Sequence, residues 1–209
     1  MNLAQLYAQT LMQIRGMVAV YLKGSLLRNE LREKSDIDLV CILKSSASLA
    51  KAYAISDGLA HVSAYTLREL RIGITTRDIN TPPAMVNFQL HHFKLLAGKP
   101  IDVSGFPVIN VRKAFQSQKR RVLETITACF EKRAGFVDIR KQTLWLAYYE
   151  LLHSQGQDIY HWGEIVRCFP KDHLYQQVYR YHKRPLKIKR GKRVRDFADT
   201  IREYIANLD

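Results

Sequence analysis

The stretch that decides the fold spans residues 18–43 and reads VAVYLKGSLLRNELREKSDIDLVCIL. An apolar run rich in strand-forming residues stands at each end, over residues 18–22 and 39–43. The residues between these runs are mostly polar and charged, and a glycine and a serine stand near their start. The pattern predicts two buried strands that flank a polar turn and a helix.

Two pairs of residues suited to chemistry lie inside this stretch. Ten residues separate Gly24-Ser25 from Asp36, and Asp38 follows two positions later. Since alternate residues of a strand point to the same face, we expect the carboxylates of Asp36 and Asp38 to project together. Two such carboxylates favour a divalent cation between them, and Mg²⁺ prefers carboxylate oxygens. At the turn, backbone N–H groups and the Ser25 hydroxyl are suited to hold a phosphate.

Gly-Ser and Asp-x-Asp at this spacing, bracketed by apolar strands, resemble the signature of the nucleotidyltransferase superfamily, which includes polymerase beta and the aminoglycoside adenylyltransferases. The resemblance implies metal-dependent transfer of a nucleoside monophosphate from a nucleoside triphosphate, expected to be ATP, to an acceptor. It implies Mg²⁺ or Mn²⁺ at Asp36 and Asp38, and the triphosphate at Gly24 and Ser25. The alternative is an ordinary turn followed by solvated surface aspartates.

The sequence departs from the family at the third carboxylate, which active members carry on a later strand. That strand matches residues 59–65, which contain no acid. If the apolar residues of this strand face the core, His61 lies at the position of the missing carboxylate. His61 is then a substitute base, a structural histidine or a mark of lost catalysis, and these interpretations stay open. Asp57 and Glu69 are near enough to replace the acid, although both are more typical of surface charges.

Length and composition set the frame for this site. A chain of 209 residues with 47% hydrophobic residues can bury one large core or two small ones. No apolar run approaches the roughly 20 residues that a membrane-spanning helix needs. The amino end also lacks a charged region followed by a signal-type apolar stretch. We therefore expect a cytoplasmic protein with no membrane partner.

The amino-terminal half mixes strand and helix patterns, so we assign residues 1–110 to a nucleotidyltransferase domain with a mixed sheet. A first helix over residues 3–14 is expected to turn one apolar face toward the core, formed by Leu3, Leu6, Leu11 and Ile14. Further helices are expected over residues 45–55 and 84–97, the latter closed by Gly98. Prolines and a glycine interrupt the periodicity around residues 101–110, which predicts the junction between the halves there.

The carboxy-terminal half, residues 111–209, has helical spacing throughout and predicts an all-α bundle, so the fold class is α+β. The expected helices span residues 113–133, 139–153, 160–168, 172–182 and 195–208. This half is similar to the helical domain of aminoglycoside adenylyltransferases, with helices carrying Trp145 and Trp162 and a turn near Gly156. A lysine that relatives often carry before the second of these helices is absent, which puts inherited nucleotide contacts in doubt.

The chain is strongly basic, with a formal net charge of +14, and much of the excess lies in residues 183–195. Such a segment favours polyanions, and basic residues next to aromatic ones can hold RNA. The alternative is a solvated loop between helices. Aminoglycosides are polycations, so this charge makes them poorly matched acceptors.

Several functions therefore stay open. An active nucleotidyltransferase comes first, with a small molecule, a protein or an RNA end as its acceptor. A catalytically impaired protein of the same fold could instead bind nucleotide, RNA or a partner protein, as antitoxin-like members of this superfamily do. A structural or nucleic-acid-binding module, in which the motif match is accidental, is the remaining alternative.

Overall fold

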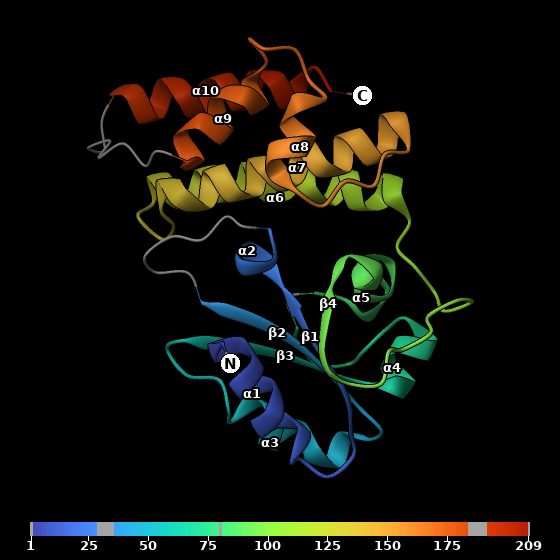
Figure 1. Cartoon of the computed structure of the whole chain (residues 1–209). Helices are drawn as coiled ribbons and strands as arrows, with labels where there is room; N and C mark the ends of the chain where they lie inside the picture. Colours follow the sequence, from blue (N-terminus) through green and yellow to red (C-terminus); the bar gives the residue numbers. More distant parts are fainter. Residues whose placement is uncertain (1, 29–35, 80, 184–191, 209) are drawn as a thin grey trace. The chain divides into compact units, whose positions relative to one another are not determined.

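The computed structural model describes residues 2–28, 36–79, 81–183 and 192–208, and the chain divides into two units, Met1–Ile109 and Asn110–Asp209. A four-stranded mixed sheet forms the centre of the first unit, with the strand order β3-β2-β1-β4 (Figure 1). The central strand β1 pairs antiparallel with β2 and with β4, and β2 pairs parallel with β3. The strands are β1 (Met17–Lys23), β2 (Ile37–Leu43), β3 (Ala60–Thr66) and β4 (Lys94–Gly98).

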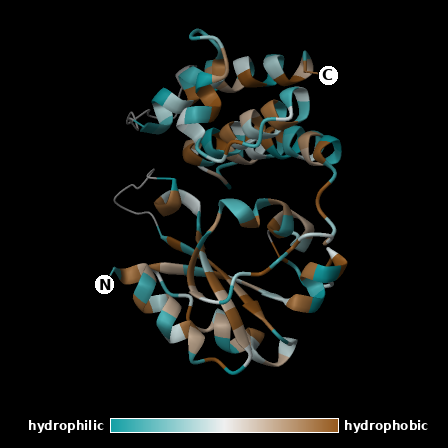
Figure 2. Cartoon of the chain, turned by 45° about the vertical axis from the view of Figure 1, so that its right-hand side comes forward, coloured by the Kyte–Doolittle hydropathy of each residue, from teal (hydrophilic) through white to brown (hydrophobic). Residues whose placement is uncertain are grey.

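One face of this sheet is buried against α1 and α3, and the central strands are correspondingly hydrophobic (Figure 2). Leu39 and Cys41 of β2 and Val62 and Ala64 of β3 belong to this core. Because side chains alternate along a strand, the intervening residues of β2 and β3 lie on the opposite face. The helices of this unit are α1 (Leu3–Met12), α2 (Gly24–Leu27), η1 (Ser46–Ser48), α3 (Leu49–Tyr53), α4 (Leu67–Ile72), α5 (Pro83–Gln89) and η2 (Leu90–His92).

The expected helix over residues 84–97 is wrong in its second half. The helical part ends at His92, the backbone of Phe93 is extended, and Lys94–Gly98 forms β4 beside β1. Short apolar runs such as Leu95-Leu96-Ala97 suit a helix or a strand equally, and here the hydrogen bonds offered by the edge of β1 decide for the strand. Gly98 therefore ends a strand and not the predicted helix, and its φ of +86° lets it lie against the backbone of Val18.

The apolar face of the first helix also differs from the expectation. Leu3 and Leu6 are exposed, whereas Ala4, Ala8 and Leu11 are buried against the sheet. Small side chains let the helix backbone approach the sheet closely, and the burial follows positions i, i+4 and i+7. The buried face of α1 is therefore rotated about the helix axis from the face that the positions of the larger apolar residues predicted.

Among the described residues of the second unit, the regular elements are all helices, which confirms the α+β fold class. Its central helix α7 is buried around most of its circumference, as at Leu146, Ala147, Tyr148 and Tyr149, and packs against α6, α8 and α9. Glu150 of α7 accepts hydrogen bonds from Tyr175 at 2.5 Å and Tyr204 at 2.8 Å, which ties α9 and α10 to it. The helices are α6 (Val111–Phe130), α7 (Phe136–Gln155), α8 (Trp162–Arg167), α9 (Leu174–Lys183) and α10 (Lys192–Ala206).

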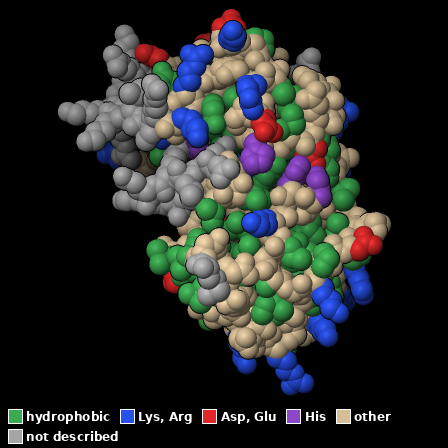
Figure 3. Space-filling model, in the orientation of Figure 1, with side chains coloured by type: hydrophobic (Ala, Val, Ile, Leu, Met, Phe, Trp, Pro, Cys, Tyr) green, Lys and Arg blue, Asp and Glu red, His purple; other side chains and the backbone are tan. Residues whose placement is uncertain are grey.

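Basic side chains are spread over both units on the face shown in Figure 3, with few acidic ones among the described residues. The basic segment 183–195, expected to contact a polyanion, lies outside the described residues over positions 184–191. Among the helices that the structure describes, none combines the length and the apolar composition needed to cross a membrane.

Candidate functional site

Three polar side chains line up across neighbouring strands on the face opposite α1 and α3. The strand register places Lys23 of β1 opposite Asp38 of β2, and Asp38 opposite His61 of β3. His61 Nδ1 lies 3.8 Å from Asp38 Oδ1, and the Lys23 ammonium donates a hydrogen bond to Ser63 Oγ at 3.3 Å. The sheet thus gathers an ammonium, a carboxylate and an imidazole around one point.

Gly24 brings the turn after β1 into contact with this cluster. Its φ is +80°, and a Cβ built on it would lie 2.1 Å from Asp38 Oδ2. Only a residue without a side chain lets the backbone pass this close to the carboxylate. The two halves of the motif, Gly-Ser and Asp-x-Asp, therefore meet in space, with Ser25 half-buried and Asp36 exposed beside them.

The surroundings of the Asp38 carboxylate disfavour its negative charge. Burial raises the pKa of Asp38, and the nearby charge of Asp36 raises it further. Lys23, His61 and Arg28 lower the pKa of Asp38 without cancelling these effects. Burial likewise lowers the pKa of the Lys23 ammonium, although Asp38 opposes this shift. The carboxylates of Asp36 and Asp38 are hard oxygen donors whose charges oppose each other, which suits them to a divalent ion.

Comparison with known proteins decides the domain type. Residues 8–81 match the family model described as a nucleotidyltransferase domain. Residues 8–81 are a nucleotidyltransferase domain. This span contains β1, β2 and β3, and with them every side chain of the cluster described above. The resemblance noted from the sequence is thereby confirmed.

A solved structure extends the likeness over both units of the chain. Spectinomycin adenyltransferase AAD(9) from Enterococcus faecialis, crystallised with ATP and spectinomycin, matches with a TM-score of 0.56 and 13% identity over 97% of each chain. At this identity the likeness shows the fold alone, a nucleotidyltransferase domain followed by helices. A comparison with curated protein sequences found no match.

Within the nucleotidyltransferase domain, the residues weighed as replacement acids are engaged elsewhere. Glu69 closes a capping box with Thr66 at the start of α4, and Asp57 accepts a hydrogen bond from Tyr7 at 2.6 Å. Lys23 is not among the predicted site residues, although a lysine at the end of a strand, next to Gly-Ser, is itself a signal for an anion site. Asp78, which no sequence pattern singles out, lines a pocket together with His61 and Ser63 of β3.

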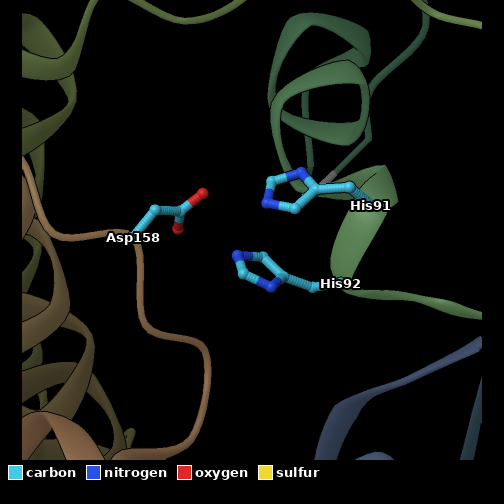
Figure 4. A group of neighbouring side chains, drawn as sticks. All are labelled: His91, His92 and Asp158. Atoms are coloured by element: carbon cyan, nitrogen blue, oxygen red, sulfur yellow. The ribbon is translucent and has the colours of Figure 1, made fainter.

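His91 and His92 come from the short helix η2, and Figure 4 shows their rings side by side. Their centroids are 3.9 Å apart with an interplanar angle of 39°. On an α-helix, adjacent side chains would point about 100° apart. The two rings nevertheless lie together at the end of a 3-10 turn, where the backbone becomes extended at Phe93.

A loop after α4 is held firmly against β3. The Arg77 guanidinium donates two hydrogen bonds to Glu69, each of 2.8 Å, and further bonds to the Tyr53 hydroxyl at 2.7 Å and the carbonyl of Ala64 at 2.9 Å. Thr75 donates to Glu69 at 2.5 Å. Glu69 therefore anchors the loop as well as capping its own helix.

Glu69→Gln removes the charge of this anchor and is expected to destabilise the first unit by about 2 kcal/mol at neutral pH, because Arg77 loses a charge-assisted pair that is part-buried. Burial raises the pKa of Glu69, but hydrogen bonds from Thr75, Thr66 and Arg77 outweigh it and hold the pKa below its ordinary value. A depressed pKa stabilises the fold above the ordinary pKa of a glutamate and loses that effect as pH falls through the folded-state value. The difference in unfolding free energy between wild type and Glu69→Gln should therefore become smaller as the pH is lowered.

Urea unfolding followed by circular dichroism measures this difference. Glu131→Gln is the matched control, because Glu131 forms an exposed pair with Arg133 and its loss should cost less than about 0.5 kcal/mol. Equal unfolding midpoints for Glu69→Gln and wild type at neutral pH would show that the loop is not anchored in this way.

Proposed function

We propose that this protein is a metal-dependent nucleotidyltransferase that moves a nucleoside monophosphate from ATP to an acceptor hydroxyl. The observation that carries the proposal is the close approach of the Gly24 backbone to the Asp38 carboxylate. This approach joins the Gly-Ser turn and the Asp-x-Asp strand of a nucleotidyltransferase domain into one site. A chance match of sequence letters would not require a glycine at that contact.

The donor atoms of the site fit a divalent cation. Asp36 and Asp38 contribute only carboxylate oxygens, and in the absence of a cation burial and their mutual repulsion disfavour the charge of Asp38. Mg²⁺ or Mn²⁺ held there would neutralise the charge of the triphosphate during transfer. Asp36 and Asp38 are the residues that we assign as its ligands.

The remaining residues of the cluster bind and orient the nucleotide. The Ser25 hydroxyl and the backbone N–H groups of the turn can donate to phosphate oxygens, and the Lys23 ammonium adds a positive charge beside them. Phosphoryl chemistry depends on positioning and charge neutralisation more than on covalent catalysis. This is why the absence of an acid on β3 does not by itself exclude turnover.

His61 occupies the register position opposite Asp38, and 51% of its side chain is exposed to solvent. An exposed imidazole at this position can reach an acceptor hydroxyl and accept its proton. The same observation favours the second candidate function, a catalytically impaired protein that binds nucleotide without turnover, because an imidazole cannot supply the negative charge of the usual carboxylate. Both candidates predict nucleotide binding, and turnover separates them.

Turnover of ATP labelled at the α-phosphate tests the proposal. The protein would be incubated with Mg²⁺ or Mn²⁺ and, in separate reactions, with water alone, spectinomycin, a short RNA and a protein extract. We expect metal-dependent release of pyrophosphate and transfer of label to one of these acceptors. Nucleotide binding without any cleavage would favour the impaired protein, and absence of binding would contradict both candidates.

A further inference from the structure

A pocket of about 280 Å³ lies along the outer edge of β3, on the side away from β2. His61 and Ser63 of β3 line it, and Tyr53 of α3 forms part of its wall. Asp78 lines the same pocket from the loop that follows α4. His61 also lies 3.8 Å from Asp38, so the pocket opens next to the proposed metal ligands.

The segment that carries Asp78 is fixed on both sides of this residue. Arg77 immediately before it is bound to Glu69, Tyr53 and the carbonyl of Ala64. Beyond it, the Tyr65 hydroxyl donates a hydrogen bond to the carbonyl of Thr81 at 2.9 Å. The loop therefore holds the Asp78 backbone in place beside β3, as a positioned catalytic group requires.

The Asp78 carboxylate itself is not used to hold the fold. It is exposed at the wall of the pocket, and among the residues that the structure describes it has no ion-pair or hydrogen-bond partner. Glu69, by comparison, is occupied by the Arg77 pair and the α4 cap. A carboxylate that is exposed, carried by a fixed loop and lines the same pocket as His61 is suited to act on a bound molecule.

We propose that this pocket binds the acceptor and that Asp78 takes the proton of the acceptor hydroxyl, as the carboxylate that β3 lacks. The inference rests on the proposed nucleotidyl transfer. The acceptor oxygen forms a bond to the α-phosphorus, the bond from that phosphorus to the bridging oxygen of pyrophosphate breaks, and pyrophosphate leaves with the electron pair. The proton of the acceptor hydroxyl passes to the Asp78 carboxylate.

The dimensions and the walls of the pocket indicate the acceptor class. Its volume lies near the lower end of the range for small-ligand pockets, about 300–1,000 Å³. The rings of Tyr53 and Tyr65 offer flat apolar surface, while Ser63 and Asp78 offer polar groups. A small hydroxyl compound fits this combination better than a polymer does.

Replacement of Asp78 by Asn tests the inference, with water as the acceptor so that no acceptor needs to be known. Cleavage of α-labelled ATP to AMP and pyrophosphate is measured for wild type, Asp78→Asn, Asp78→Glu and His61→Gln, and ATP binding with Mn²⁺ is measured by calorimetry. We expect Asp78→Asn to cleave about 10²-fold more slowly while binding ATP within about two-fold of wild type. Asp78→Glu should recover part of the rate. Asp102→Asn, an exposed acid of the same unit whose carboxylate contacts Ser104, should behave as wild type.

The outcomes separate this inference from the function on which it rests. Wild-type cleavage rates in Asp78→Asn would overturn the inference and leave the proposed function standing. Loss of cleavage in His61→Gln alone would also overturn it and assign the proton to the imidazole. If wild type binds ATP but does not cleave it, the proposed transfer itself fails, and the role of Asp78 with it.

Discussion

The double variant Asp36→Asn, Asp38→Asn is expected to lose metal-dependent ATP binding and to turn over about 10³-fold or more slowly than wild type. The physical reason is that carboxamide oxygens keep the shape of the site but remove the negative charge that a divalent cation needs. Calorimetric titration with ATP and Mn²⁺, followed by the cleavage assay with α-labelled ATP, measures both effects. Titration with Mn²⁺ alone, monitored by electron paramagnetic resonance, shows whether the variant has lost metal binding itself or only nucleotide binding.

A control must account for the change of two charges in a protein that is already basic. Asp196 and Asp199 on α10 are exposed and lie in the second unit, so Asp196→Asn with Asp199→Asn raises the net charge equally and leaves the candidate site intact. This variant should bind and turn over ATP as wild type does. Equal heats of metal and nucleotide binding in wild type and in the Asp36 and Asp38 double variant would contradict the assignment of Asp36 and Asp38 as metal ligands.

Sequence patterns predicted the centre of this domain because local and long-range constraints agree there. β1 and β2 are short apolar runs on either side of the motif, and either run would be buried in almost any compact arrangement. The family resemblance and strand alternation together placed His61 at the position of the missing carboxylate, and the parallel register of β2 and β3 sets this residue opposite Asp38. For these strands, the order of apolar and polar residues is enough to predict which side chains share a face.

Other features depend on tertiary pairing that no local pattern encodes. β4 forms because β1 offers hydrogen bonds on its second edge, and the same residues continue a helical pattern when considered alone. Asp78 lies beside β3 through its neighbours, since Arg77 binds Glu69 and the carbonyl of Ala64, and Tyr65 binds the carbonyl of Thr81. A sequence search for a third acid on the strand could not find one that comes from a loop beside that strand.

Gly24→Ala is expected to damage both stability and function. At φ +80° an alanine costs about 1–2 kcal/mol relative to glycine. Its Cβ would also lie 2.1 Å from Oδ2 and 2.9 Å from Cγ of Asp38, so the carboxylate must move. A displacement of about 1 Å at a catalytic group can lower the rate by about 10²-fold. We expect a loss of this size in ATP cleavage, together with weaker Mn²⁺ binding.

Two other glycines of the same unit separate the causes of this loss. Gly105 has φ +77° and open space where a Cβ would stand, so Gly105→Ala carries the same backbone cost without a collision. Gly58 has open space and no positive φ, so Gly58→Ala should change neither stability nor turnover. If Gly105→Ala is destabilised but active while Gly24→Ala is inactive, the loss follows from the displaced Asp38 carboxylate. Full activity of Gly24→Ala would show that turnover does not depend on the position of the Asp38 carboxylate. This result would contradict its assignment as a metal ligand, because a ligand must keep its position.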